Sequence, residues 1–162
     1  MASRGADLII NGLEGAVTAQ HIIDDLERVH NVKVAYSDAD IRNPDQIAEM
    51  MALAPEKFDG RNVSVLVNNA GIQHVSSIEN FELEAWRRVL EINLTSNFLT
   101  IKAALPSMRA ARWGRIINVA SVHGRVASVN KSAYVASKVC CPLAILHVVR
   151  FLSLPLSLPL LY

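Results

Sequence analysis

The feature that most constrains the fold is the alternation of short β-branched runs with longer amphipathic stretches. Residues 63–67 and 115–119 are runs rich in valine and isoleucine, and residues 83–108 between them carry apolar side chains at helical spacing. Two such strands joined by a helix predict a right-handed crossover and a parallel sheet covered on both faces. The chain has 162 residues, of which 51% are hydrophobic, and this suits one domain with a sizeable core.

The first sixty residues repeat this alternation. Residues 7–11 and 32–36 have the pattern of short strands, and residues 14–30 that of an amphipathic helix. Asn43 followed by Pro44 predicts the start of a second helix, because asparagine caps helices and proline fits their first turn. We therefore predict an α/β fold of the Rossmann-like, doubly wound parallel type.

Two polar segments follow the strands that flank the long helix. Asn68, Asn69, Ala70 and Gly71 come directly after the first of these strands, and Ser121 comes just after the second. Ligands of doubly wound sheets collect at the carboxyl ends of the strands. These segments are therefore the first candidates for a functional site.

A tyrosine and a lysine follow Ser121 at a spacing that suits acid–base chemistry. Tyr134 and Lys138 lie 13 and 17 positions after Ser121, so a helix would place both on one face. A nearby ammonium stabilises a phenolate, and such a pair can exchange protons with a substrate. By itself the spacing is common on solvated helix faces, so this alternative stays open.

Together with Asn93 on the long helix, these segments resemble the short-chain dehydrogenase/reductase family over residues 5–138. The resemblance implies hydride exchange with a nicotinamide cofactor. In it Ser121 holds the substrate oxygen, Tyr134 exchanges its proton, and Lys138 stabilises the tyrosinate and holds the nicotinamide ribose. Asn93 would organise a proton-relay water. The alternatives are a helix residue that satisfies backbone groups for Asn93 and a turn residue for Ser121.

The resemblance also implies a cofactor-binding set. Asp40 and Ile41 match the acidic-apolar pair that flanks adenine, and the segment from Asn69 through Ala70 to Gly71 matches the one that lines the adenosine ribose. Tyr134 and Lys138 complete this set. Residues 11–14 contain no arginine or lysine for a ribose 2′-phosphate, so NAD is expected rather than NADP.

A narrower resemblance, over residues 68–74 and 120–134, is to the 3-hydroxybutyrate dehydrogenase group of this family. It implies that Gln73, His123 and Lys131 bind the carboxylate of a small hydroxy or keto acid, which is chemically reasonable because all three can donate hydrogen bonds. The expected reaction interconverts 3-hydroxybutyrate and acetoacetate. Two alternatives stay open: a different alcohol or ketone substrate, and a truncated, non-catalytic fragment.

Composition excludes several other classes of function. The net charge of +1 comes from scattered residues with no basic stripe, so we expect no nucleic-acid partner. Two adjacent cysteines, Cys140 and Cys141, suit neither a disulfide framework nor a metal site. We expect a cytoplasmic protein, with a mitochondrial address left open, and the resemblance implies homo-oligomers.

Both ends depart from the family pattern. We expect the first strand, the glycine-rich turn and the C-terminal strands to be missing, which leaves a partial dinucleotide-binding catalytic domain at 1–138. Residues 139–162 form a divergent apolar tail, which we explain by a missed splice or a shifted reading frame. Its three prolines, with His147 and Arg150, argue against a membrane-spanning helix.

Overall fold

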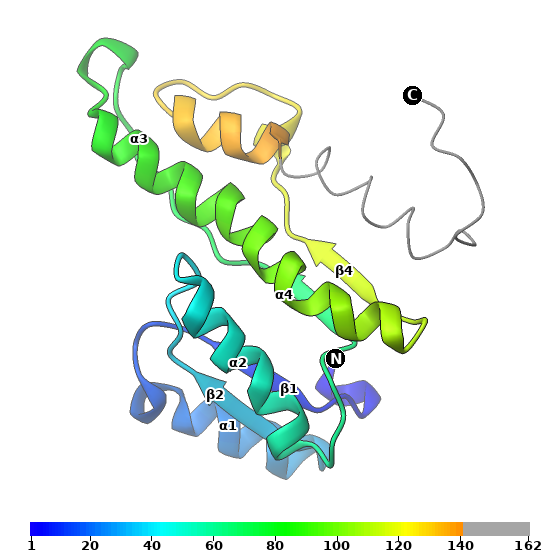
Figure 1. Ribbon diagram of the computed structural model, residues 1–162. Helices are drawn as coiled ribbons and strands as arrows, with labels where there is room; N and C mark the ends of the chain where they lie inside the picture. Colours follow the sequence, from blue (N-terminus) through cyan, green and yellow to red (C-terminus); the bar gives the residue numbers. More distant parts are fainter. Residues whose placement is uncertain (141–162) are drawn as a thin grey trace, which may run out of the picture. The chain divides into compact units, whose positions relative to one another are not determined.

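The computed structural model describes residues 1–140, which belong to two compact units, residues 1–63 and the part of the chain from Ser64 onward (Figure 1). The tail prediction falls on residues 141–162 for the most part, and these lie outside the described residues.

The first unit alternates two strands with two helices. After a short 3₁₀ turn, η1 (Ala2–Arg4), its elements are β1 (Leu8–Asn11), α1 (Ala16–His30), β2 (Val34–Ser37) and α2 (Pro44–Lys57). The two strands are parallel, with Leu8 opposite Val34. The core between them and α2 is built from five apolar side chains: Ile9, Ala35, Ala54, Phe58 and Val63.

Local chemistry sets the helix ends of this unit. The Asn43 side-chain oxygen accepts hydrogen bonds from the backbone N–H groups of Asp45 and Gln46, at 2.9 and 3.4 Å, so the predicted cap of α2 is confirmed. Helix α1 ends at His30, and its C-cap Asn31 adopts a left-handed conformation with φ of 52°. Asparagine tolerates this conformation better than most residues, which explains the sharp stop before β2.

The second unit also contains two parallel strands, β3 (Val65–Asn68) and β4 (Arg115–Asn118), with Leu66 opposite Ile116. Between them lie a 3₁₀ turn, η2 (Ile78–Asn80), and one long helical segment that packs on β3. A short turn, η4 (Val122–Gly124), follows β4, and residues 132–140 form a further helix, drawn in orange in Figure 1.

The long helical segment differs from the uniform helix that its sequence predicts. It consists of α3 (Leu83–Leu90), a π-helical turn η3 (Glu91–Thr95) and α4 (Ser96–Ala110). Pro106 lies within α4. The wide turn contains Asn93, whose side chain forms its hydrogen bonds outside this helix, so a tertiary contact accompanies the local change of helix type.

The α/β prediction with parallel strands is confirmed, but the described strands form two two-stranded sheets. In the doubly wound order 3-2-1-4-5-6, the first strand lies between the second and the fourth. By the resemblance, β1 and β2 match the second and third strands, and β3 and β4 the fourth and fifth. None of the described residues adds a third strand to either sheet.

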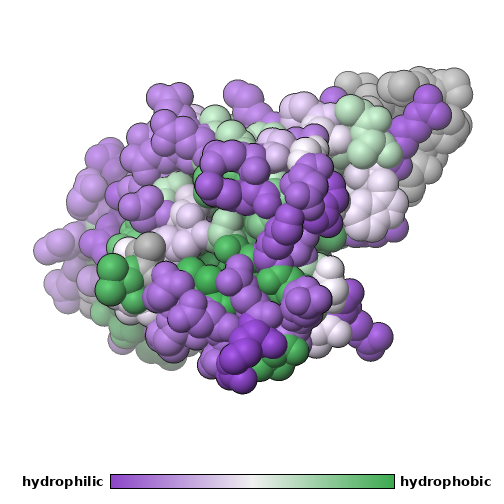
Figure 2. All heavy atoms as spheres, turned by 90° about the horizontal axis from the view of Figure 1, so that it is seen from below, coloured by the Kyte–Doolittle hydropathy of each residue, from purple (hydrophilic) through white to green (hydrophobic). Residues whose placement is uncertain are grey.

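Apolar side chains also reach the surface. Leu13, Val17 and Val29 of the first unit are exposed, and in Figure 2 apolar residues in green lie among polar residues in purple on the face in view. Within residues 1–140, no helix combines the length and apolar character that crossing a membrane requires.

Candidate active site

Asn93 is a buried polar side chain of the second unit with three hydrogen bonds. It is 1% exposed, and its Oδ1 accepts a hydrogen bond from the backbone N–H of Ile72 at 2.8 Å. Its Nδ2 donates to the backbone oxygen of Ile72 at 2.9 Å and to Oγ of Ser137 at 3.0 Å. The amide of Asn93 therefore joins the loop after β3 to the helix at residues 132–140.

Tyr134 and Lys138 lie one turn apart on that helix, as the spacing predicts. Lys138 is 5% exposed, and its Nζ donates to the backbone oxygen of Val119 at 2.8 Å. The same Nζ lies 5.8 Å from the centroid of the half-buried Tyr134 ring. The carbonyl at the end of β4 thus fixes an ammonium group close to a phenol.

The turn after β4 brings Ser121 and His123 to the same region. Oγ of Ser121 accepts a hydrogen bond from the backbone N–H of His123 at 3.2 Å and so caps η4. The His123 ring packs edge-on against the Tyr134 ring, with 6.1 Å between their centroids. Its Nδ1 lies 3.3 Å from the backbone oxygen of Val126.

Gly124 permits this close approach. A Cβ atom added there would lie only 2.7 Å from the backbone oxygen of Lys138. Glycine is therefore required because the backbone of the turn packs directly on the helix that carries Tyr134 and Lys138.

The loop after β3 carries the next group of candidates. Asn69, Ala70, Gly71 and Gln73 are exposed, and a Cβ added at Gly71 would lie 3.4 Å from Oδ1 of Asn93 and 3.7 Å from Nζ of Lys138. Because glycine has no side chain, the backbone of Gly71 is exposed next to the buried amide of Asn93 and the buried ammonium of Lys138.

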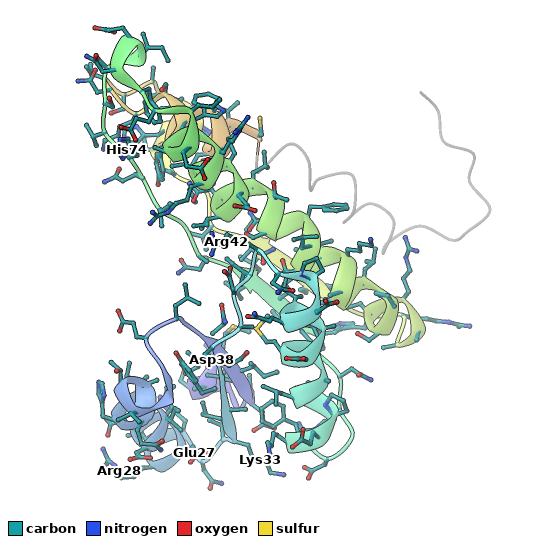
Figure 3. The ribbon with its side chains drawn as sticks, turned by 60° about the vertical axis from the view of Figure 1, so that its left-hand side comes forward. Glu27, Arg28, Lys33, Asp38, Arg42 and His74 are labelled. Carbon is teal, nitrogen blue, oxygen red and sulfur yellow. The ribbon has the colours of Figure 1, made fainter. Side chains whose placement is uncertain are left out.

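Lys131 lies half-buried just before the helix at residues 132–140. A hydrogen bond of 2.9 Å between the backbone N–H of Ser76 and the backbone oxygen of Asn130 ties its segment to the loop of Gln73. The loop also carries His74, labelled in Figure 3, whose ring packs edge-on against Phe81 with 5.2 Å between the centroids. These contacts hold the segment just after Gln73 and the residue just before Lys131.

The structure thus brings together Asn93, Tyr134, Lys138, Ser121, His123 and Gly71, with Gln73 and Lys131 on adjoining backbone. Asp40 and Ile41 lie in the first unit, in the segment between β2 and α2. The guanidinium and backbone N–H of Arg42, labelled in Figure 3, donate to the Asp40 carboxylate and hold its pKa below the ordinary value. Asp40 is therefore an ionised acceptor at neutral pH.

Sequence reasoning missed two contributors to this site. Ser137 accepts the hydrogen bond of Asn93 from 44 positions away, and its place three residues after Tyr134 on one helix face was the available signal. The backbone oxygen of Val119, which holds Lys138, has no signal in the sequence because any residue type supplies a carbonyl.

Among residues 1–140, no cluster of three histidine, cysteine, aspartate or glutamate side chains could hold a metal ion. The described site offers hydroxyl, phenol, amide, imidazole and ammonium groups.

Comparison with known proteins places this geometry in a family. The family model described as short chain dehydrogenase matches residues 1–147. The D-beta-hydroxybutyrate dehydrogenases of Rhizobium meliloti (strain 1021) and Cupriavidus necator are 44% and 48% identical over 138 residues, which is 85% of this chain and 53% and 52% of theirs.

A trans-4-hydroxycyclohexanecarboxylate dehydrogenase of Sinomonas cyclohexanicum is 38% identical over 142 residues, which is 85% of this chain and 54% of the relative. The chain spans about half the length of these curated relatives. The matching family model and the arrangement of Asn93, Ser121, Tyr134 and Lys138 lead to one conclusion: this chain belongs to the short-chain dehydrogenase family.

Proposed function

We propose that this chain carries the catalytic centre of an NAD-dependent dehydrogenase that interconverts 3-hydroxybutyrate and acetoacetate. The observation that carries the proposal is the packing of three segments around one helix turn. The Ser121–His123 turn, the loop of Gly71 and Gln73, and the side chain of Asn93 all meet the helix of Tyr134 and Lys138.

In this proposal the phenol of Tyr134 is the acid and base. It gives its proton to the substrate oxygen during reduction of the ketone and takes a proton back during oxidation of the alcohol. Ser121 donates a hydrogen bond to the same oxygen. The ammonium of Lys138, held by the Val119 carbonyl at 2.8 Å, stabilises the tyrosinate left after proton transfer. When bound, the nicotinamide ring supplies or accepts the hydride.

Gln73, His123 and Lys131 are proposed to bind the substrate carboxylate. All three can donate hydrogen bonds, and donors that are held in fixed positions bind a charged carboxylate most selectively. The backbone bond between Ser76 and Asn130 supports this, because it ties together the two segments that carry Gln73 and Lys131. The names of three relatives also refer to hydroxylated carboxylates.

Each unit by itself offers groups that suit a part of a nicotinamide dinucleotide. The exposed Gly71 leaves space 3.7 Å from the Lys138 ammonium, a donor that suits ribose hydroxyls, and Asn69 and Ala70 continue this surface. The ionised Asp40, with Ile41 beside it, offers an acceptor for an adenine amino group. NAD is proposed over NADP because the exposed Leu13 and Glu14 after β1 offer a 2′-phosphate no positive charge.

The decisive experiment measures acetoacetate-dependent oxidation of NADH by this chain, through the absorbance of the nicotinamide. We expect Tyr134→Phe to lower kcat by about 100-fold or more, since it removes the proton donor. Its circular dichroism should match that of the wild type, since only a hydroxyl is deleted. A Tyr134→Phe variant with unchanged kcat would refute the assignment.

The substrate assignment needs its own comparison. Alanine at Gln73, His123 or Lys131 should raise KM for acetoacetate, and trans-4-hydroxycyclohexanecarboxylate should be a poorer substrate with NAD than 3-hydroxybutyrate. Faster turnover of the cyclohexane acid, or an unchanged KM in all three variants, would contradict the substrate and point to another alcohol.

A further inference from the structure

Ser137 is a buried hydroxyl that the proposed chemistry does not use. Its side chain lies at 0% exposure on the helix at residues 132–140, between Tyr134 and Lys138 in the sequence. Its Oγ donates a hydrogen bond to the backbone oxygen of Tyr134 at 2.7 Å and accepts one from Nδ2 of Asn93 at 3.0 Å. The hydroxyl therefore has both a donor and an acceptor role.

The direction of these two bonds determines what Ser137 can do. Because its single proton goes to the Tyr134 carbonyl, the lone pairs of Oγ are left to face the amide of Asn93. Serine hydroxyls often bond to their own helix in this way, and such a bond alone would have no functional meaning. The second bond is different, because it crosses from the helix to a side chain 44 positions earlier.

The Asn93 amide extends this link to the substrate loop. Both polar groups of the Ile72 backbone bond to it, and Ile72 directly precedes Gln73. One continuous series of buried and part-buried hydrogen bonds thus runs from the loop of Gln73 through Asn93 and Ser137 to the backbone of Tyr134.

We propose that Ser137 is a positioning residue, which fixes the helix of Tyr134 and Lys138 relative to Asn93 and the loop of Gln73. The proposal rests on the function proposed above. Without the hydroxyl, Nδ2 of Asn93 keeps only the Ile72 carbonyl, and one of its N–H groups stays buried without an acceptor. The helix can then shift relative to the loop, although the phenol and the ammonium are both still present.

The test compares Ser137→Ala with Ser107→Ala in the full chain. Ser107 is a matched control because its Oγ also donates to the backbone oxygen three residues earlier, that of Ala104 at 2.9 Å. The first readout is the side-chain amide of Asn93 in an NMR spectrum of asparagine-labelled protein, assigned by its loss in Asn93→Asp. We expect Ser137→Ala to shift the NMR signal of one N–H proton of this amide. The exchange of that proton with water should become roughly tenfold faster, because one hydrogen bond is lost.

The second readout is turnover of acetoacetate. Ser137→Ala should lower kcat by up to about 100-fold with a smaller change in KM, because misplacement by about 1 Å has an effect of that size. Ser107→Ala should leave kcat and the Asn93 signals unchanged. Ser137→Cys keeps the shape of the side chain with a slightly larger atom that is a weaker acceptor, and its effect should lie between those of serine and alanine. It serves in both readouts if Ser137→Ala does not fold.

The two readouts separate this proposal from the proposed function. If the Asn93 signals are the same in Ser137→Ala and in the control, the hydrogen bond between Asn93 and Ser137 is refuted, and the value of kcat does not change this conclusion. A shifted amide with unchanged kcat would refute the positioning role. A wild-type chain without turnover would refute the proposed function for this chain, and the NMR comparison would still decide whether Ser137 holds Asn93.

Discussion

Substitution of Gly124 by alanine tests whether the turn after β4 needs a residue without a side chain where it packs on the helix of Tyr134 and Lys138. The added Cβ would lie 2.7 Å from the backbone oxygen of Lys138 and 3.4 Å from its carbonyl carbon. Ordinary contacts begin near 3.4 Å, so the turn and the helix must separate by about 0.7 Å. Both neighbouring atoms belong to the backbone of Lys138 and not to a flexible side chain, so the strain must displace the backbone of the turn or of the helix.

Two magnitudes follow from this displacement. Overpacking of this kind costs about 1–3 kcal/mol of the free energy of unfolding. A shift of the turn also moves Ser121 and His123 away from Tyr134, and we expect kcat for acetoacetate to fall by roughly 10- to 100-fold. Both effects should appear in the same variant, because the same 0.7 Å separation causes them.

The assay is urea unfolding followed by circular dichroism, combined with the rate of NADH oxidation. Gly71→Ala is the control for stability, because its Cβ would meet its nearest neighbour at 3.4 Å, an ordinary contact. We expect this control to unfold within about 0.5 kcal/mol of the wild type. If Gly124→Ala is as stable as Gly71→Ala, the close approach of turn and helix is not a constraint and the reasoning fails.

Two further predictions concern the first unit. The backbone N–H of Lys33, with help from Arg61, lowers the pKa of Asp7, so its ionised form adds stability that is present above about pH 4 and is lost as pH falls further. Thermal melts at pH 5 and pH 3 should show this loss, and Asp7→Asn should reduce the difference; an unchanged difference would contradict the assignment. Asn43→Ala should cost about 1 kcal/mol in urea unfolding, because it removes the cap of α2, and a loss below about 0.3 kcal/mol would show that the cap contributes little.

The parts of the fold that were predicted from the sequence depend on local chemistry. The strands at β3 and β4 were predicted because β-branched residues cluster there, and the start of α2 because Asn43 and Pro44 act within one turn. The joint position of Tyr134 and Lys138 followed from helix geometry alone. In each case the signal lies within a few residues of the feature.

The parts that were missed depend on contacts distant in sequence. The periodicity of residues 83–108 gives no sign of the π turn, which accompanies hydrogen bonds from Asn93 to Ile72 and Ser137. Phe98 follows the apolar pattern of that segment and yet is 60% exposed. Roles that depend on a partner 44 positions away have no local signature.

The π turn at η3 also constrains how relatives of this chain can vary in length. A π turn contains one residue more than an α turn of the same helix. The wide turn absorbs this extra residue, so deleting a single residue between Glu91 and Thr95 would leave an ordinary α turn with α3 and α4 in nearly the same rotational relation. The local backbone that places the Asn93 amide on Ile72 would then be lost. Single deletions should therefore be tolerated in the exposed loops of this unit and be absent from these five positions in any relative that keeps the amide contact.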